Sequence, residues 1–247
     1  MNNGNEKNLA VLIDADNVSA KYIKSLLNEV SNHGTPTIKR IYGDWTSTRM
    51  SSWKNVLLSH SITPIQQYSY TTGKNSTDAS LIIDAMDILY GNKVDGFCIV
   101  SSDSDFTRLA SRLRETGMYV LGMGEKKTPK PFISACEQFK YLEVLGSVDD
   151  KKEAAADKLP TVKESNVTTK KTLTAAITAI VEESSGDDGW VSLSEVGSKL
   201  SRRYPDFDTR NYGYKNLSSL VKSLKKFKLE LRKVTNSNKR HNYISTI

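Results

Sequence analysis

The sequence of 247 residues has few of the features that would place a protein outside the cell or in a membrane. It contains two cysteines, Cys98 and Cys136, and neither has another cysteine or a histidine at the spacing of metal ligands. We therefore expect buried thiols rather than disulfides or a zinc finger. No apolar run is long enough to cross a bilayer, and two aspartates interrupt the first apolar segment, so it cannot be a signal-peptide core. These absences predict a cytoplasmic protein with one large or two smaller domains.

The excess of positive charge lies in the last third of the chain. Residues 1–160 contain 19 lysines and arginines against 19 acidic residues, whereas residues 161–247 contain 16 against 9. This distribution is typical of a catalytic unit joined to a module for a polyanion such as nucleic acid. A basic surface that only aids solubility would give the same count.

Strand and helix signals alternate over the first part of the chain. Short apolar runs predict buried strands at residues 9–13, 37–42, 62–66, 97–100 and 119–123. Segments with helical spacing lie between them, and Gly34 and Gly117 follow two of these segments, where a left-handed cap is expected. The alternation favours an α/β fold with a parallel sheet covered by helices on both faces.

The remainder of the chain has a different organisation. Residues 147–169 have mixed charge and few large apolar side chains, which is typical of a linker. Three helical segments and two β-like runs follow, a pattern that predicts a small winged-helix α+β domain. The predicted organisation is a first domain at 1–146, a linker at 147–169 and a second domain at 170–247.

Acidic residues follow two of the predicted strands. Asp14 and Asp16 come after the first strand, and Asp103 and Asp105 come after the strand at 97–100. The carboxyl ends of parallel strands share one edge of a sheet, so these carboxylates can converge there. Converging anions require a cation or a proton, and a set of oxygen ligands without cysteine or histidine favours Mg²⁺ or Mn²⁺.

Asp78, at the start of a predicted helix, is a third contributor. At 100° per residue it points the same way as Ile82 and Ala85, whereas Asp87 lies half a turn away and Asp84 about 120° away. Taken alone, Asp78 could be only a stabilising charge at a helix N-terminus. Beside the other acidic residues we interpret it as a metal ligand.

Several of these residues have a second interpretation. Asp103 could cap the helix that follows it, and Asp16 could cap a helix that starts near Ala20. Asn17 could orient a metal-bound water or a phosphate, and Lys74 could reach a phosphate, although both could also be solvated loop residues.

The motifs of the first domain resemble the bacterial NYN domain of the PIN-like nuclease superfamily. They are LIDADNV, KNSTD at residues 74–78, IVSSDSDF and GMGEKKTPKPFISACEQF, in this order over about residues 8–146. The resemblance implies a ribonuclease in which carboxylates hold Mg²⁺ or Mn²⁺ for phosphodiester hydrolysis. By position these are Asp14, Asp78, Asp103 and Asp105, with Asn17 beside them. This metal-dependent mechanism needs no histidine as a base, and we expect His33 and His60 to be solvated or capping residues.

The second domain resembles a LOTUS domain, also called OST-HTH. The resemblance covers about residues 170–247 and includes the segment NYGYKNLSSLVKSL at residues 211–224. It implies a winged helix that binds RNA or a protein partner. The clustered aromatic and cationic side chains suit base stacking and phosphate contacts, although we expect one of the two tyrosines to be structural; the candidates are Tyr212, Tyr214, Lys215, Lys222, Lys225 and Lys226.

The predicted function is a metal-dependent ribonuclease with an RNA-binding module, and two alternatives stay open. LIDADNV also fits the D-x-D-x-[TV] motif of haloacid-dehalogenase phosphatases, with Asp14 as nucleophile and Asp16 as acid. The other alternative is a non-catalytic RNA-binding adaptor, because a fold and its motifs do not prove turnover. The segment GEKKTPKPF also has two interpretations, a loop that touches RNA backbone or a plain surface connection.

Overall fold

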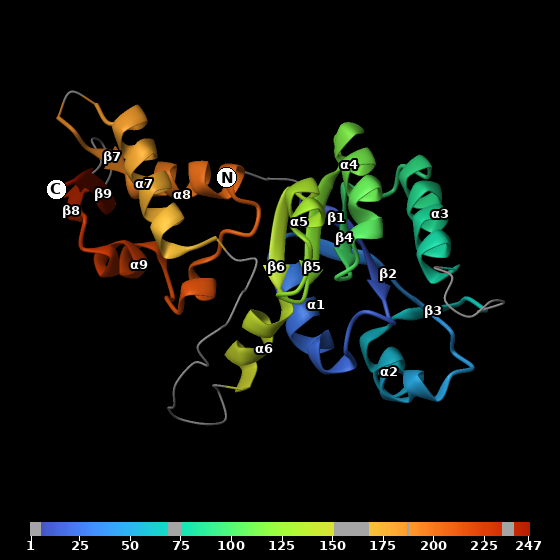
Figure 1. Cartoon of the computed structure of the whole chain (residues 1–247). Helices are drawn as coiled ribbons and strands as arrows, with labels where there is room; N and C mark the ends of the chain where they lie inside the picture. Colours follow the sequence, from blue (N-terminus) through green and yellow to red (C-terminus); the bar gives the residue numbers. More distant parts are fainter. Residues whose placement is uncertain (1–5, 69–75, 151–167, 187, 234–239) are drawn as a thin grey trace. The chain divides into compact units, whose positions relative to one another are not determined.

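The computed structural model of the protein describes residues 6–68, 76–150, 168–186, 188–233 and 240–247. Within these ranges the chain divides into two compact units, one in residues 6–150 and the other in residues 168–247 (Figure 1). Among the described residues, no helix is both long and apolar enough to span a membrane. The domain bounds 1–146, 147–169 and 170–247 stay a prediction, because most of the expected linker lies outside the described residues.

A six-stranded parallel sheet forms the centre of the first unit. Its strands, in the spatial order β3-β2-β1-β4-β5-β6, are β1 (Asn8–Asp14), β2 (Thr35–Gly43), β3 (Thr63–Gln66), β4 (Gly96–Val100), β5 (Tyr119–Gly124) and β6 (Gln138–Tyr141). β1 and β4 lie at the centre and are buried almost throughout, which explains their unbroken apolar sequences. The predicted α/β fold with a parallel sheet is confirmed. Among the strands of this sheet, the short β6 strand was not predicted.

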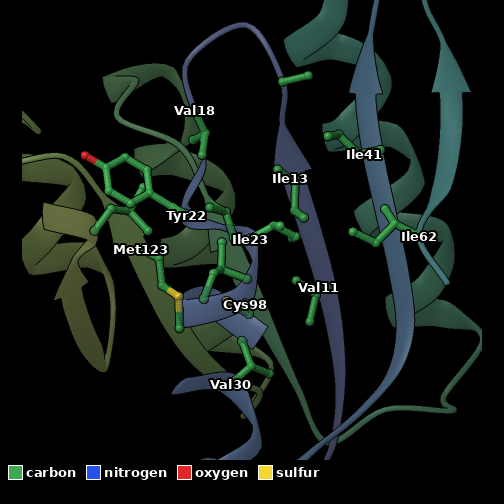
Figure 2. Packing of buried hydrophobic residues seen from close by; sticks show 14 of the residues in the cluster. Val11, Ile13, Val18, Tyr22, Ile23, Val30, Ile41, Ile62, Cys98 and Met123 are labelled. Atoms are coloured by element: carbon green, nitrogen blue, oxygen red, sulfur yellow. The ribbon is translucent and has the colours of Figure 1, made fainter. Parts of the chain in front are cut away.

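Helices cover both faces of this sheet. They are α1 (Ile23–Ser31), α2 (Ser51–Leu57), α3 (Ser76–Tyr90), α4 (Thr107–Glu115), α5 (Lys130–Ala135) and α6 (Leu142–Asp150). Residues of α1, α2 and α6 pack with Val11 and Ile13 of β1 in one core. Figure 2 shows Val11 and Ile13 in this core together with Ile23 and Val30 of α1. Side chains alternate along a strand, so Asp14 points to the opposite face, where α3 packs against β1. The fold thereby directs Asp14 towards the helix that carries Asp78.

The two glycines expected to cap helices have different roles. Gly117 has φ +83°, as a left-handed cap requires. Gly34 does not adopt a positive φ, so that part of the prediction is wrong. A Cβ atom at Gly34 would lie 2.3 Å from the carbonyl oxygen of Lys7. Gly34 therefore allows two backbone segments to approach closely.

Among its described residues, the second unit contains three α-helices, a short 3-10 helix at Thr209–Tyr212 and a three-stranded antiparallel sheet. The helices are α7 (Lys170–Ser184), α8 (Leu193–Arg203) and α9 (Leu217–Leu224), and the strands, in the order β7-β9-β8, are β7 (Val191–Ser192), β8 (Phe227–Lys233) and β9 (Arg240–Thr246). The helices and strands enclose one apolar core, which includes Ile177, Leu200 and Ile244. This arrangement agrees with the predicted winged-helix α+β domain. The two-residue strand β7 was not predicted.

Candidate metal centre

Three carboxylates converge at the carboxyl-terminal edge of the parallel sheet. Asp78 lies in the first turn of α3, and Asp103 and Asp105 follow β4. Each offers one carboxylate oxygen, and the three oxygens lie within 4.8 Å of one another. Asp78 is buried, Asp103 is half-buried and Asp105 is exposed, so the cluster opens to solvent. The start of α3 and the end of β4, distant in the sequence, thus bring three of the predicted site residues together, and their role as metal ligands stays a prediction.

Asp14 lies next to this cluster but does not belong to the group of oxygens that are within 4.8 Å. Its side chain is fully buried at the end of β1. One oxygen, Oδ2, accepts hydrogen bonds from Asn17 Nδ2 and Ser101 Oγ, both at 2.7 Å, and Oδ1 accepts one from the Asp16 backbone N–H at 3.1 Å. Burial raises the pKa of Asp14, and the hydrogen bonds from Ser101 and Asn17 counteract that rise. Asn17 thus orients the Asp14 carboxylate, and its contact with a metal-bound water or a phosphate stays a prediction.

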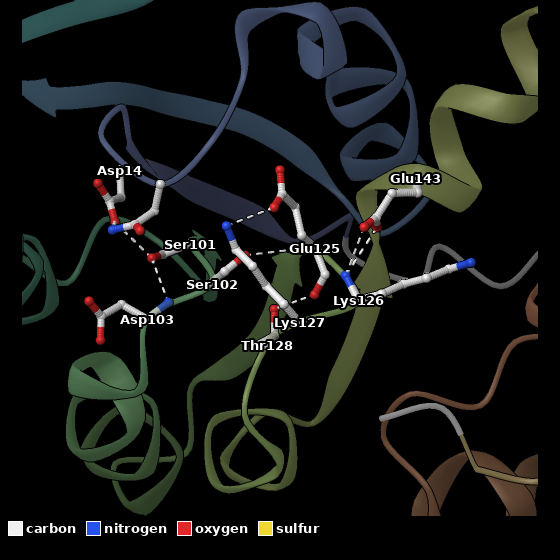
Figure 3. A network of polar contacts seen from close by, with 10 residues as sticks. Asp14, Ser101, Ser102, Asp103, Glu125, Lys126, Lys127, Thr128 and Glu143 are labelled. Carbon is white, nitrogen blue, oxygen red and sulfur yellow. Dashed lines mark hydrogen bonds and ion pairs between the residues drawn. The ribbon is translucent and has the colours of Figure 1, made fainter. Parts of the chain in front are cut away.

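Ser101 connects the two strand ends and was not predicted as a site residue. Its buried hydroxyl donates to Asp14 and accepts a hydrogen bond from the backbone N–H of Asp103 at 3.0 Å (Figure 3). The hydroxyl therefore fixes the position of Asp103 relative to Asp14. The only sequence signal for it is its place directly after the apolar residues of β4, one residue before Ser102 and two before Asp103.

The helix-capping interpretation holds for Asp103 and fails for Asp16. Asp103 Oδ1 accepts a hydrogen bond from the Asp105 N–H at 2.9 Å and so caps the short helix Ser104–Phe106. This capping bond uses one of its carboxylate oxygens. Asp16 is exposed and does not cap the helix at Ala20–Tyr22, which begins at Ser19 without a side-chain cap.

The electrostatics of Asp78 show that negative charge is concentrated at this site. Burial and, after it, the neighbouring carboxylates, with Asp14 first and Asp103 next, together raise the pKa of Asp78 to about 6. Repulsion and burial both disfavour the ionised form. A cation bound among these oxygens would offset both.

The other two aspartates of α3 lie outside the cluster. Asp84 accepts hydrogen bonds from Arg40, with which it forms an ion pair, and from the hydroxyl of Tyr42. Burial and the neighbouring Asp84 raise the pKa of Tyr42. Asp87 is exposed, as its helical position predicts. Asp84 thus attaches α3 to β2, an interaction that the sequence did not indicate.

Lysines on the second unit give it a cationic surface. Lys215, Lys222, Lys225 and Lys226 are all exposed. Lys225 ends α9 in a left-handed conformation with φ +53°. Lys74, the other predicted phosphate ligand, lies outside the described residues.

The two candidate tyrosines of the second unit both pack against its core, and one of them has a clear structural bond. The Tyr212 hydroxyl donates a hydrogen bond to the carbonyl oxygen of Thr168 at 2.8 Å, and burial raises its pKa. The ring of Tyr214 lies 5.3 Å from the ammonium group of Lys170. Tyr212 therefore has the structural role expected of one tyrosine.

A groove of about 400 Å³ in the second unit was not predicted. It lies between the starts of α8, α9 and β9, and its polar lining includes Ser194, Ser218, Arg240 and His241. Across one side of it, Asn242 Nδ2 donates to Ser218 Oγ at 3.3 Å. The residues that form it are far apart in the sequence, so no local pattern could reveal it.

Similar solved structures do not indicate a function. A protein of unknown function from Vibrio parahaemolyticus RIMD 2210633 is 17% identical, at a TM-score of 0.47, over 56% of this chain and 94% of its own. An uncharacterized protein from Nitrosomonas europaea is 33% identical over 38% of this chain and 88% of its own, with a TM-score of 0.30. A segment of a Chromobacterium violaceum protein is 36% identical over 30% of this chain and 78% of its own, with a TM-score of 0.26. No curated protein matches the chain.

The family models agree with the two units. Residues 8–143 match the NYN domain, and residues 168–238 match the OST-HTH/LOTUS domain. The first match covers more than half of the chain and includes Asp14, Asp78, Asp103 and Asp105. The chain therefore belongs to the NYN family of PIN-like nuclease domains, here joined to an OST-HTH/LOTUS domain.

Proposed function

We propose that the protein is a metal-dependent ribonuclease that hydrolyses RNA phosphodiesters at the acidic cluster. The observation that carries the proposal is the convergence of the oxygens of Asp78, Asp103 and Asp105 within 4.8 Å. PIN-like nuclease domains generally use divalent metals, and the NYN match covers all three residues.

The residues of the cluster fit a hard divalent cation. All three donors are carboxylate oxygens, the ligand type that suits Mg²⁺ and Mn²⁺, and no cysteine or histidine belongs to the group. The raised pKa of Asp78 supports the same conclusion, because burial and the neighbouring carboxylates both disfavour its ionised form, which a bound cation would favour. We assign Asp78, Asp103 and Asp105 as ligands and Asp14 as the adjacent fourth carboxylate.

Each residue around the cluster has a defined task in this proposal. Asn17 and Ser101 hold the Asp14 carboxylate in one orientation, and Ser101 also fixes the backbone of Asp103. The cap formed by Asp103 places Asp105 at the start of the next helix. When bound, a divalent cation lowers the pKa of a water molecule and neutralises charge on the phosphate. The chain contributes ligands that are fixed in place before RNA arrives.

The second unit is proposed to capture the RNA. OST-HTH/LOTUS domains bind RNA, and this one presents the exposed lysines at residues 215, 222, 225 and 226. Such cations bind phosphates without regard to sequence, and their contribution weakens as salt increases. A protein partner at this domain stays a second possibility.

The geometry disfavours the phosphatase alternative. In that mechanism Asp14 would be the nucleophile, but this residue is fully buried and its two carboxylate oxygens accept three hydrogen bonds. A nucleophilic oxygen must reach the phosphorus atom of its substrate. Asp14 is better suited to support the cluster than to attack.

The test is cleavage of a labelled single-stranded RNA by the wild type and by Asp103→Asn, with EDTA, Mg²⁺ or Mn²⁺, beside a small phosphate ester. We expect cleavage that needs metal and is lost in the variant, with the ester left intact. RNA binding without cleavage under every condition would favour the adaptor. Hydrolysis of the ester alone would restore the phosphatase.

A further inference from the structure

The acidic cluster creates a difficulty for an RNA substrate. Asp14, Asp78, Asp103 and Asp105 place negative charge at the edge of the sheet where a negatively charged strand has to approach. A cation at the cluster offsets part of this charge, but the phosphates on either side of the cleaved bond still need positive partners. Those partners have to lie at the same edge and be held in place.

The loop at residues 125–129 meets the first requirement. It connects β5 to α5 and begins at the carboxyl end of β5. β5 is the parallel neighbour of β4, and the Ser101 N–H bonds the carbonyl oxygen of Met123 at 3.0 Å. Neighbouring strands lie about 4.8 Å apart. The loop therefore starts one strand away from the segment that carries Ser101 and Asp103.

Backbone contacts hold this loop at both sides. The Glu125 N–H donates to Ser102 Oγ at 2.9 Å, and the Lys126 N–H donates to the two carboxylate oxygens of Glu143 at 2.9 and 3.2 Å (Figure 3). Within the loop, the Thr128 N–H and hydroxyl both donate to the Glu125 carbonyl oxygen, at 2.9 and 2.5 Å. The loop is thus fixed through backbone atoms, which leaves its lysine side chains available.

Adjacent serines join this loop to the acidic centre. Ser101 bonds Asp14, and the next residue, Ser102, bonds the loop at Glu125. Gly124, the last residue of β5, is closely surrounded by both parts, because a Cβ atom there would lie 2.5 Å from the Ser101 carbonyl oxygen, just after β4, and 2.6 Å from Thr128 Oγ1 of the loop. Loop and acidic centre therefore form one continuous polar structure.

Two lysines project from this loop in different directions. Figure 3 shows the Lys127 side chain on the side that faces Asp14, while the Lys126 side chain extends the opposite way, away from Asp14. Lys127 Nζ lies 2.9 Å from Glu125 Oε2, but its side chain is 65% exposed, and such surface pairs are weak. Within the part of the chain that the structure describes, Lys126 has no ion pair. Neither ammonium group is held in a strong ion pair by the described residues, so both can bind phosphate groups.

We propose that Lys126 and Lys127 form a binding site for the phosphate backbone of an RNA strand and guide that strand across the acidic cluster. The inference rests on the proposed nuclease function and adds the direction of the strand. It runs from the cluster past Lys127 to Lys126. The lysines bind substrate, and Glu143 and Ser102 are positioning residues because they hold the loop.

The test compares two pairs of lysines in the full-length protein. Lys126→Ala/Lys127→Ala removes the loop cations, and Lys7→Ala/Lys93→Ala removes two exposed lysines that precede β1 and β4, at the opposite edge of the sheet. Binding of a labelled single-stranded RNA is measured in EDTA over a series of salt concentrations. Each phosphate that is no longer neutralised lowers the slope of log affinity against log salt by about 0.7. We expect a fall of about 1.4 for the loop pair and none for the control pair.

Kinetics with Mn²⁺ provide the second measurement. The loop pair should raise KM roughly tenfold and change kcat by less than about twofold, because the lysines bind the strand without touching the reacting bond. Glu143→Ala should raise KM in the same way with both lysines intact, and Glu143→Gln should restore it, since its amide oxygen can still accept the Lys126 N–H. Equal slopes for both pairs, or a fall in kcat alone, would overturn the proposal.

The two proposals can fail separately. An altered salt slope for the loop pair in a protein that never cleaves RNA would retain the phosphate site and reject the nuclease. Metal-dependent cleavage with unchanged slopes would retain the nuclease and reject the phosphate site.

Discussion

The two units of the protein hold their charged side chains in opposite ways. In the NYN unit Asp14 and Asp78 are buried, and hydrogen bonds fix the orientation of Asp14 and Asp103. In the OST-HTH/LOTUS unit the cations Lys215, Lys222 and Lys226 are exposed. Chemistry needs ligand atoms at fixed positions, whereas capture of a flexible strand needs charge that can adapt. The acidic cluster of the first unit should therefore control the rate of cleavage, whereas the lysines of the second unit, together with the loop lysines Lys126 and Lys127 of the first, should control the affinity.

The largest expected effect is on kcat, and it should differ among variants of the three aspartates in helix α3. Asp78→Asn should lower kcat for RNA at least about a hundredfold, because it removes one ligand of the cluster. Asp84→Asn should lower the free energy of unfolding by about 1–3 kcal/mol, because it removes the ion pair with Arg40 and one of the two oxygens that accept from Arg40 and Tyr42. Asp87→Asn should change either quantity little, because Asp87 is exposed. Cleavage kinetics and urea unfolding of all three variants measure kcat and the free energy of unfolding. A similar loss of kcat in Asp78→Asn and Asp87→Asn would contradict the assignment of Asp78 as a metal ligand.

The pH dependence of metal binding sharpens the account of the first unit. The pKa of Asp78 is about 6 in the folded protein, above its ordinary 3.8, so the folded state holds the proton more tightly. Without metal, the free energy of unfolding should fall as pH rises from about 4 through about 6, by an amount on the order of 2 kcal/mol. Protonated Asp78 is a poor ligand, so the stabilisation by Mg²⁺ should increase as pH rises through 6.

Thermal unfolding with Mg²⁺ or EDTA between pH 4.5 and 8 measures this effect. Asp78→Asn removes the titrating group and is the matched control, which should show a much smaller dependence of Mg²⁺ stabilisation on pH. Equal stabilisation by Mg²⁺ at pH 5 and pH 8 in the wild type would exclude Asp78 as a ligand.

Removal of three lysines from the second unit should reduce the affinity for RNA without affecting the chemical step. Lys215→Ala/Lys222→Ala/Lys226→Ala should lower the salt slope of RNA binding by up to about 2, at about 0.7 for each phosphate that these lysines neutralise. Cleavage at saturating RNA should remain within about twofold. Salt titrations of binding and single-turnover kinetics measure the two effects. If the salt slope is unchanged, the second unit does not capture RNA through these lysines.

The smallest expected effect concerns the two tyrosines of the second unit. Tyr212→Phe removes the hydrogen bond to the Thr168 carbonyl oxygen and should cost about 0.5–1.5 kcal/mol of stability, with little change in RNA affinity. Tyr214→Ala should weaken RNA binding more than Tyr212→Phe does, because it removes an aromatic face on which a base can stack. Equal RNA affinity of the two variants would contradict a binding role for Tyr214. Thermal unfolding measures the stability of both variants, and binding of a labelled RNA measures their affinity. Together the two measurements distinguish the structural role of Tyr212 from the binding role of Tyr214.

The features that could be predicted from sequence are those that local patterns determine. The unbroken apolar run of β1 indicates a central strand, and an aspartate at its end indicates the carboxyl edge of the sheet. Helical periodicity separates Asp78, which faces the sheet, from Asp87, which does not. The motifs of the NYN and LOTUS families identify both units.

The features that could not be predicted depend on contacts between distant segments. Ser101 is important because it lies between Asp14 and Asp103, and Asp84 because α3 brings it to Arg40 and Tyr42. A serine after a strand and an aspartate within a helix have no distinctive sequence signal. Gly34 was expected to cap a helix, but its true constraint is the nearby Lys7 carbonyl oxygen, which lies on another segment.

Binding of Mn²⁺, followed by electron paramagnetic resonance in parallel with RNA cleavage, tests the central claim most directly. The proteins compared are the wild type, Asp103→Asn and the control Asp87→Asn. The account predicts that the wild type and Asp87→Asn bind Mn²⁺ and cleave RNA over the same range of Mn²⁺ concentration, and that Asp103→Asn loses both. Unchanged Mn²⁺ binding and cleavage in Asp103→Asn would contradict the assignment of this cluster as the catalytic metal centre.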